Sequence, residues 1–139
     1  MSTASEALAH LPAGNKPLLI AVTVLTSMDQ TELNQIGVAS SVEQQVLALG
    51  KLAMQSGCDG VVCSAKEASA ITLELPGLLK VTPGIRVAGD SNSDQRRVMT
   101  PCKAVESGAD YLVIGRSVTD SADPVATLES INSDLRMIN

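Results

Sequence analysis

Aromatic side chains are almost absent from this chain of 139 residues, which has no tryptophan, no phenylalanine and one tyrosine. Proteins that bind single-stranded nucleic acids stack the bases on aromatic rings, so this composition argues against a nucleic-acid partner. The net charge of -5 also disfavours binding to a polyanion. A small cationic pocket for a single phosphate group remains compatible with this charge.

Histidine and cysteine are also scarce. His10 is the only histidine, so a mechanism with histidine as general base or metal ligand is disfavoured. The cysteines, Cys58, Cys63 and Cys102, lack the C-x-x-C spacing of metal and redox sites, and we interpret them as reduced thiols of a cytoplasmic protein. Cys63 and Ser64 would suggest a nucleophile, but no neighbouring histidine is available to activate it.

No hydrophobic run is long enough to cross a bilayer. The longest spans residues 18–25, whereas a membrane helix needs about 20 apolar residues. The first residues show neither the basic segment nor the sustained apolar segment of a secretory signal. The sequence therefore predicts a soluble, cytoplasmic protein with no membrane partner.

The sequence does contain short runs that are rich in β-branched residues. They read as buried strands at residues 18–25, 60–64, 79–82 and 111–115. Strands that alternate with helical segments imply right-handed crossovers and a parallel sheet, which defines the α/β class. Because no linker or change of composition interrupts the chain, residues 1–139 should form a single domain.

Helices are expected between these strands. Residues 2–11 look like the end of a helix that leads into the first strand, and residues 42–56 carry apolar side chains at helical spacing. The start signals are capping boxes or an N-cap followed by proline, namely Ser40 with Glu43, Ser64 with Glu67, Thr100-Pro101 and Asp123-Pro124. The expected order is α(βα)₄.

Candidate ligand-binding residues follow the strands, because ligands of parallel α/β folds bind beyond the carboxyl ends of the strands. Gly115 and Arg116 follow the fourth strand. They suit a phosphate, since glycine allows close approach and arginine gives a bidentate contact; a plain turn with a solvated arginine is the alternative. Thr26 and Ser27, after the first strand, would either bind the polar edge of a ligand or cap the next turn.

The segment at residues 83–99 lacks hydrophobic periodicity and reads as a long loop. Loops of this length in compact domains are usually functional lids or disordered segments. As a lid, the segment would bring Arg86, Gln95, Arg96 and Arg97 over an anion. The alternative is a disordered polar insertion without a binding role.

Five segments, in this order and spacing, carry a resemblance to a known family. They are LLIAVTVLTSM at 18–28, GVVCSA at 60–65, VTPGIR at 81–86, DQRR at 94–97 and VIGRSVT at 113–119. Together they resemble the bacterial orotidine 5'-phosphate decarboxylases over essentially the whole chain. The resemblance implies a TIM (β/α)₈ barrel, and because a complete barrel needs about 250 residues, this chain would hold its C-terminal half, about strands five to eight.

The resemblance also implies an activity. Members of the family are lyases that convert orotidine 5'-monophosphate (OMP) to UMP and CO₂ in pyrimidine biosynthesis, as homodimers and without a metal or organic cofactor. The implied substrate-binding residues are Thr26 and Pro83 at the pyrimidine, Arg86 and Gln95 on the loop that closes over the ribose phosphate, and Gly115 and Arg116 at the phosphate.

The charged catalytic centre of that family has no counterpart in this sequence. Its Asp-x-Lys-x-x-Asp motif is missing, since none of the eight aspartates is followed two positions later by lysine. No catalytic residue is therefore assigned, and the chain alone is expected to be inactive. Its partners would be OMP, UMP or phosphate, and either a second copy or a missing N-terminal half.

Two other functions are compatible with the same residues. One is a non-catalytic half-barrel that binds phosphate and associates with itself to bury its open edges. The other is a different phosphate-binding barrel enzyme, such as a sugar-phosphate decarboxylase or epimerase. The second is disfavoured by the Val-Thr-Val-Leu-Thr-Ser and Asp-Gln-Arg-Arg runs.

Overall fold

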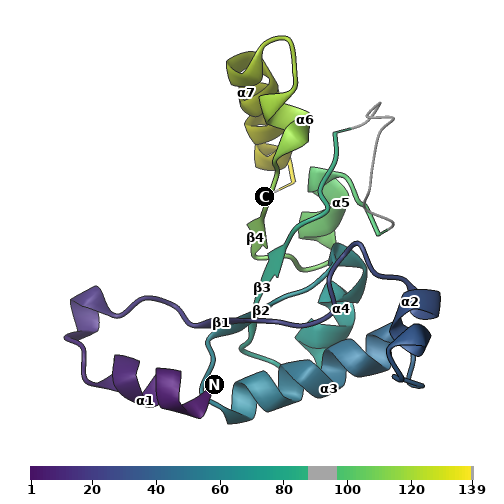
Figure 1. Cartoon of the computed structure of the whole chain (residues 1–139). Helices are drawn as coiled ribbons and strands as arrows, with labels where there is room; N and C mark the ends of the chain where they lie inside the picture. Colours follow the sequence, from purple (N-terminus) through teal and green to yellow (C-terminus); the bar gives the residue numbers. More distant parts are fainter. Residues whose placement is uncertain (88–96, 139) are drawn as a thin grey trace.

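The strands form a single parallel sheet in the computed structural model of the chain, which describes residues 1–87 and 97–138 (Figure 1). They are β1 (Ile20–Val22), β2 (Gly60–Val62), β3 (Leu79–Thr82) and β4 (Tyr111–Leu112). Their order in space is their order in the sequence, and every neighbouring pair is parallel. The predicted α/β class is confirmed, although β1, β2 and β4 are shorter than expected.

Helices connect the strands as the sequence predicts. They are α1 (Ser2–Ala9), α2 (Gln30–Gln35), α3 (Val42–Gln55), α4 (Ala65–Glu74), α5 (Pro101–Glu106), α6 (Arg116–Thr119) and α7 (Pro124–Arg136), with a 3₁₀ turn, η1, at Ala13–Asn15. The capping box of Ser64 with Glu67 is confirmed at the start of α4. Asp123 caps α7 by accepting a hydrogen bond from the backbone N–H of Ala126 at 3.0 Å. Among the described residues, no helix is long and apolar enough to cross a bilayer.

Three helix starts differ from the expectation. The capping box of α3 is formed by Ser41 and Gln44, so the predicted pair of Ser40 and Glu43 is wrong by one position. Helix α2 was not predicted, although the side chain of Asp29 caps it and Glu32 completes the box. The sequence predicts a turn after β4, whereas the structure has the short helix α6 there.

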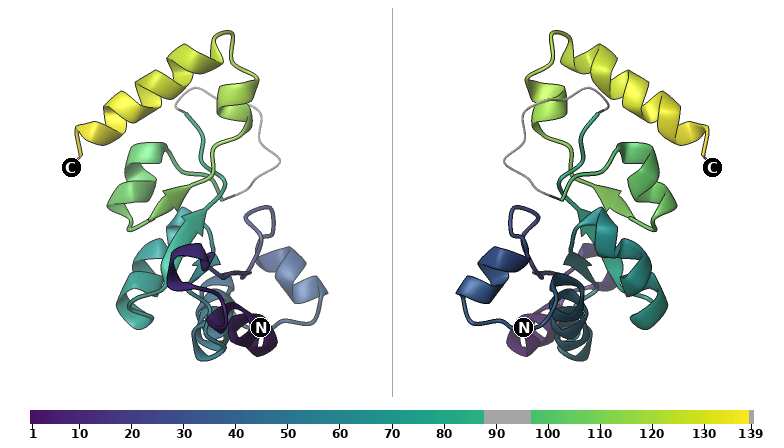
Figure 2. Two further views of the ribbon diagram at one scale, coloured as in Figure 1. Left: turned by 90° about the vertical axis from the view of Figure 1, so that its left-hand side faces the viewer. Right: turned by 90° about the vertical axis from the view of Figure 1, so that its right-hand side faces the viewer.

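One face of the sheet packs against helices α3, α4 and α5 (Figures 1 and 2). Val61 and Cys63 point to this side, where they are fully buried against Val46 of α3 and Ile71 of α4. Lys80 lies beside Val61 in the register, so its side chain points to the same side. The hydrophobic core therefore lies between the sheet and this helical layer.

The opposite face carries a row of apolar side chains across all four strands. Val22 pairs in register with Val62, Val62 with Val81, and Val81 with Tyr111. We call these four residues the open-face row. Val22 is 58% exposed and Tyr111 is 51% exposed, so in the part of the chain that the structure describes this face is open to solvent.

Carboxylates fix the amino ends of the strands. Asp59, just before β2, accepts a hydrogen bond from the backbone N–H of Leu19 at 2.8 Å. Asp110, just before β4, accepts one from the backbone N–H of Lys80 at 2.7 Å and forms an ion pair with its Nζ at 2.9 Å. The two aspartates thus tie β1 to β2 and β3 to β4 at the end opposite to the candidate site.

Candidate functional site

The candidate residues lie beyond the carboxyl ends of the strands, which meet at one edge because all four strands are parallel. Thr26 follows β1 and is buried, with 6% of its surface exposed. Pro83 follows β3 directly and is half-buried. Gly115 and Arg116 follow β4 and are exposed. Each of these residues is therefore at the edge that the sequence predicts.

The turn after β3 places Arg86. Gly84 has a φ of 79°, a left-handed conformation that favours glycine. Beyond it, the backbone N–H of Arg86 donates to the carbonyl of Met99 at 3.0 Å, and the N–H of Met99 donates to the carbonyl of Gly84 at 3.2 Å. The Arg86 side chain is buried and donates to the Ile85 carbonyl at 2.9 Å. Gln95 lies outside the described residues.

A hollow of about 400 Å³ adjoins Arg86. Its lining combines apolar side chains with two cations and a hydroxyl. The lining residues are Arg86, Val87, Val98, Met99, Thr100 and Lys103.

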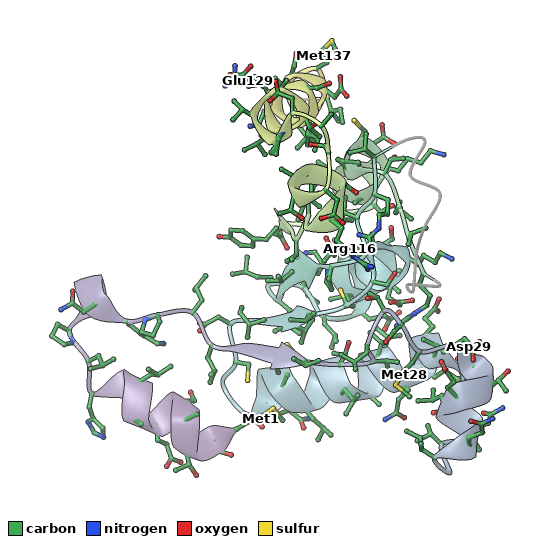
Figure 3. The ribbon with its side chains drawn as sticks, turned by 45° about the horizontal axis from the view of Figure 1, so that its top comes forward. Met1, Met28, Asp29, Arg116, Glu129 and Met137 are labelled. Carbon is green, nitrogen blue, oxygen red and sulfur yellow. The ribbon has the colours of Figure 1, made fainter. Side chains whose placement is uncertain are left out.

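The turn after β4 brings an approachable backbone and an arginine side chain together. The Gly115 carbonyl accepts hydrogen bonds from the N–H groups of Val118 at 2.8 Å and Thr119 at 3.1 Å, which closes the turn into α6. A Cβ atom at Gly115 would meet no atom within 4 Å, so the backbone is open to close approach. Figure 3 shows Arg116 beyond the strand ends, in the central part of the molecule.

Arg97 has a different position from the one that the sequence suggests. The sequence leaves two alternatives for its segment, a lid over an anion or a disordered polar insertion. The Arg97 side chain is instead 9% exposed and forms an ion pair with Glu67, Nη1 to Oε1, at 2.7 Å. Burial raises the pKa of Glu67, and the charge of Arg97 opposes this shift. The lid role is therefore wrong for Arg97. Because the partners are 30 residues apart in the sequence, no local pattern identifies this pair.

Comparison with known proteins assigns the chain to a family. The profile of the orotidine 5'-phosphate decarboxylase / HUMPS family matches residues 1–131. The chain belongs to this family. The orotidine 5'-phosphate decarboxylase of Pseudoalteromonas translucida is 54% identical over 137 residues, which are 97% of this chain and 58% of that protein. That of Neisseria meningitidis serogroup A is 54% identical over 134 residues, 95% of this chain and 54% of that protein.

Solved structures show that the chain also shares the fold of this decarboxylase family. The crystal structure of orotidine 5'-phosphate decarboxylase from Lactobacillus acidophilus is 38% identical and superposes with a TM-score of 0.75, over 96% of this chain and 57% of that one. The chain thus spans little more than half the length of the relatives that it matches. Its four βα units have the fold of half of a (β/α)₈ barrel.

Cys63 directly follows β2, at the edge of the sheet where the candidate residues lie. Burial raises the pKa of its thiol to about 12, and the nearby carboxylate of Glu67 adds to the shift. Since the thiolate is the nucleophile, a thiol with this pKa is unreactive at neutral pH. Among residues 1–87 and 97–138, no group of three or more His, Cys, Asp and Glu side chains is arranged to hold a metal ion.

Thiol labelling should distinguish the three cysteines. Cys102 is half-buried, whereas Cys58 is 8% exposed and Cys63 is fully buried. At about pH 8 the thiolate fraction of Cys63 should be on the order of a thousandfold below that of an ordinary thiol. A disulfide reagent should therefore label the native chain once, at Cys102, and the denatured chain at all three cysteines. Mass spectrometry of native Cys102→Ser should show no rapid labelling; labelling at Cys63 would contradict the burial described here.

Proposed function

We propose that this chain is the phosphate- and pyrimidine-binding half of an orotidine 5'-phosphate decarboxylase. It would bind OMP or UMP through Thr26 and Pro83 at the pyrimidine and through Arg116 at the phosphate, without a metal or organic cofactor. It would not catalyse decarboxylation by itself. Arg86 and Gln95 would add contacts to the ribose phosphate.

The turn at Gly115 and Arg116 is the observation that carries this proposal. It combines an arginine, an approachable backbone and a fixed geometry, because β4 holds it on one side and α6 packs against α7 on the other. A preorganised turn does not lose conformational entropy when the anion binds. A guanidinium beside backbone N–H groups is the arrangement that best matches a phosphate.

An NMR titration with UMP tests the proposal. The amide signals of Gly115 and Arg116 should shift on addition of UMP, and those of Thr26 should shift with them. Inorganic phosphate should shift only the first two, since it has no pyrimidine. If the amides near Lys80 and Asp110 moved instead, the ligand would bind at the wrong end of the strands and the proposed site would be refuted.

The second candidate function, a self-associating module that binds phosphate without chemistry, is favoured by the accessible surface. The chain exposes 8141 Å², whereas a monomeric protein of 14.4 kDa exposes roughly 6,800 Å². The excess of about 1,300 Å² lies in the range that each partner buries in a permanent dimer. The open-face row lies on one such uncovered surface. Two copies related by a twofold axis along the strands would form eight parallel strands.

Light scattering at micromolar concentration should therefore show a dimer, with twice the mass of the 14.4 kDa chain. A charge on the open-face row should prevent it, so Val22→Glu should be monomeric. Leu73→Glu is the matched control, because Leu73 is 78% exposed on α4, away from the open face, and this variant should remain dimeric. A stable wild-type monomer would argue against self-association.

A further inference from the structure

Arg97 joins three segments that are far apart in the sequence. Its Nη1 donates to Oε1 of Glu67 at 2.7 Å, and its Nη2 donates to the carbonyls of Val24 at 3.1 Å and Leu25 at 2.8 Å. The carbonyl of Arg97 itself accepts a hydrogen bond from Oγ of Ser64 at 3.3 Å. The side chain of Arg97 therefore ties it to the segment just after β1. Its side chain and its backbone together tie it to the start of α4.

The Leu25 carbonyl is the centre of the turn that carries Thr26. It accepts hydrogen bonds from the N–H of Met28 at 3.0 Å and from Nη2 of Arg97 at 2.8 Å. Thr26 lies between Leu25 and Met28, which the first of these hydrogen bonds joins. Figure 3 shows Met28 in the same segment, beyond β1. The guanidinium of Arg97 thus fixes the backbone on which the Thr26 side chain depends.

Glu67 anchors this arrangement to a rigid element. Its second oxygen, Oε2, accepts a hydrogen bond from the backbone N–H of Ser64 at 3.1 Å, and both residues belong to the capping box of α4. Ser64 is fully buried and Glu67 is 5% exposed. Through Glu67 the turn after β1 is therefore held against the helix that follows the neighbouring strand.

Within the described part of the chain, the Arg97 ion pair leaves one donor of the guanidinium unsatisfied. Nε of Arg97 is buried and has no hydrogen-bond partner among the described residues, and a buried unpaired donor lowers stability. A second ion pair, Lys80 with Asp110, has a buried cation and an exposed carboxylate, with side chains 9% and 36% exposed, and lies at the amino ends of the strands, away from the candidate residues. The two ion pairs therefore provide a test and a control within one chain.

We propose that Arg97 is a positioning residue for the ligand site. It holds the Thr26 turn at the place where the hydroxyl meets the pyrimidine, while its own side chain stays in the core and does not contact the ligand. This proposal rests on the proposed function for the identity of the ligand, but not for the effect of Arg97 on the turn. Loss of Arg97 should weaken contacts to the base and leave contacts to the phosphate unchanged.

The experiment compares Arg97→Met and Lys80→Met, each of which removes a buried, ion-paired cation. Arg97→Lys is a third variant, which keeps the charge but loses the fork of donors. Both methionine variants should lower thermal stability. Only the Arg97 variants should speed hydrogen exchange of the Met28 amide and weaken UMP binding, each by roughly tenfold, the effect expected for one lost charged hydrogen bond. Affinity for inorganic phosphate should change less than about twofold, because no phosphate contact is lost.

The outcomes separate the two proposals. If wild type binds neither UMP nor phosphate, the proposed function fails, and exchange of the Met28 amide alone decides the role of Arg97. Faster exchange in Arg97→Lys than in Lys80→Met supports the positioning role, and equal exchange overturns it. If Arg97→Met does not fold, Arg97→Lys provides the same comparison. Equal loss of UMP and phosphate affinity in Arg97→Lys would also overturn the proposal.

Discussion

OMP incubated with the purified 139-residue chain should lose CO₂ no faster than OMP in buffer. Decarboxylation leaves a carbanion that needs a proton donor and an organised set of charges, and the Asp-x-Lys-x-x-Asp centre of the family has no counterpart in this sequence. Lys80, a lysine on one of the strands, cannot replace it. Its side chain is 9% exposed and ion-paired with Asp110 at the opposite end of the sheet.

Adding the part of the family's barrel that this chain does not span should raise the rate of decarboxylation by orders of magnitude. The matched experiment mixes the chain with the part of the Pseudoalteromonas translucida relative that it does not cover, made as a separate polypeptide, and follows release of CO₂. The control is the same part with the lysine of the family's Asp-x-Lys-x-x-Asp motif replaced by alanine. Both chains should be produced in a host that lacks its own decarboxylase. Turnover by the 139-residue chain alone would contradict the proposal.

Arg116→Ala should lower the affinity for UMP and for inorganic phosphate by ~10- to 100-fold. Hydrogen bonds to charged groups are worth roughly 1.5–3 kcal/mol, and the guanidinium supplies the charged donors of the turn after β4. A titration monitored by the Gly115 amide signal measures the loss. Since Arg116 is exposed, the melting temperature should change little.

Arg136→Ala is the control for the loss of one positive charge. Arg136 is an exposed arginine in the last turn of α7, and its removal changes the net charge by the same amount. Its affinity for phosphate should equal that of the wild type. Equal weakening by both substitutions would mean that phosphate responds to the overall charge of the chain rather than to a site at Arg116.

The sequence predicts the strands well in position and poorly in length. The apolar run at residues 18–25 suggests a strand of that extent, but Leu18 and Leu25 are 53% and 55% exposed and only Ile20–Val22 pairs with β2. Hydrophobicity identifies residues suited to a strand, whereas the length of the ladder depends on the partner strand. Consecutive serines at positions 40 and 41 explain the misplaced cap of α3 in the same way, since either can begin a helix.

Some residues of the candidate site can be placed from the sequence, and others cannot. Thr26 and Arg116 follow strands, and the parallel topology is sufficient to bring them to one edge. Arg97 and Glu67 are brought together only by the tertiary fold. Each also has a plausible local role, a lid for Arg97 and a capping box for Glu67, so the sequence does not indicate their contact. Glu67 was correctly placed in a capping box, but one oxygen of its carboxylate satisfies the cap and the other binds Arg97.

The identical order of the strands in sequence and in space has a consequence for synthesis. Each βα unit packs against the one made just before it, so these contacts can form in order while the ribosome is still adding residues. The turn at Arg116 belongs to the last unit, after β4. A nascent chain should therefore resist proteolysis at β1 to β3 before it gains any affinity for phosphate.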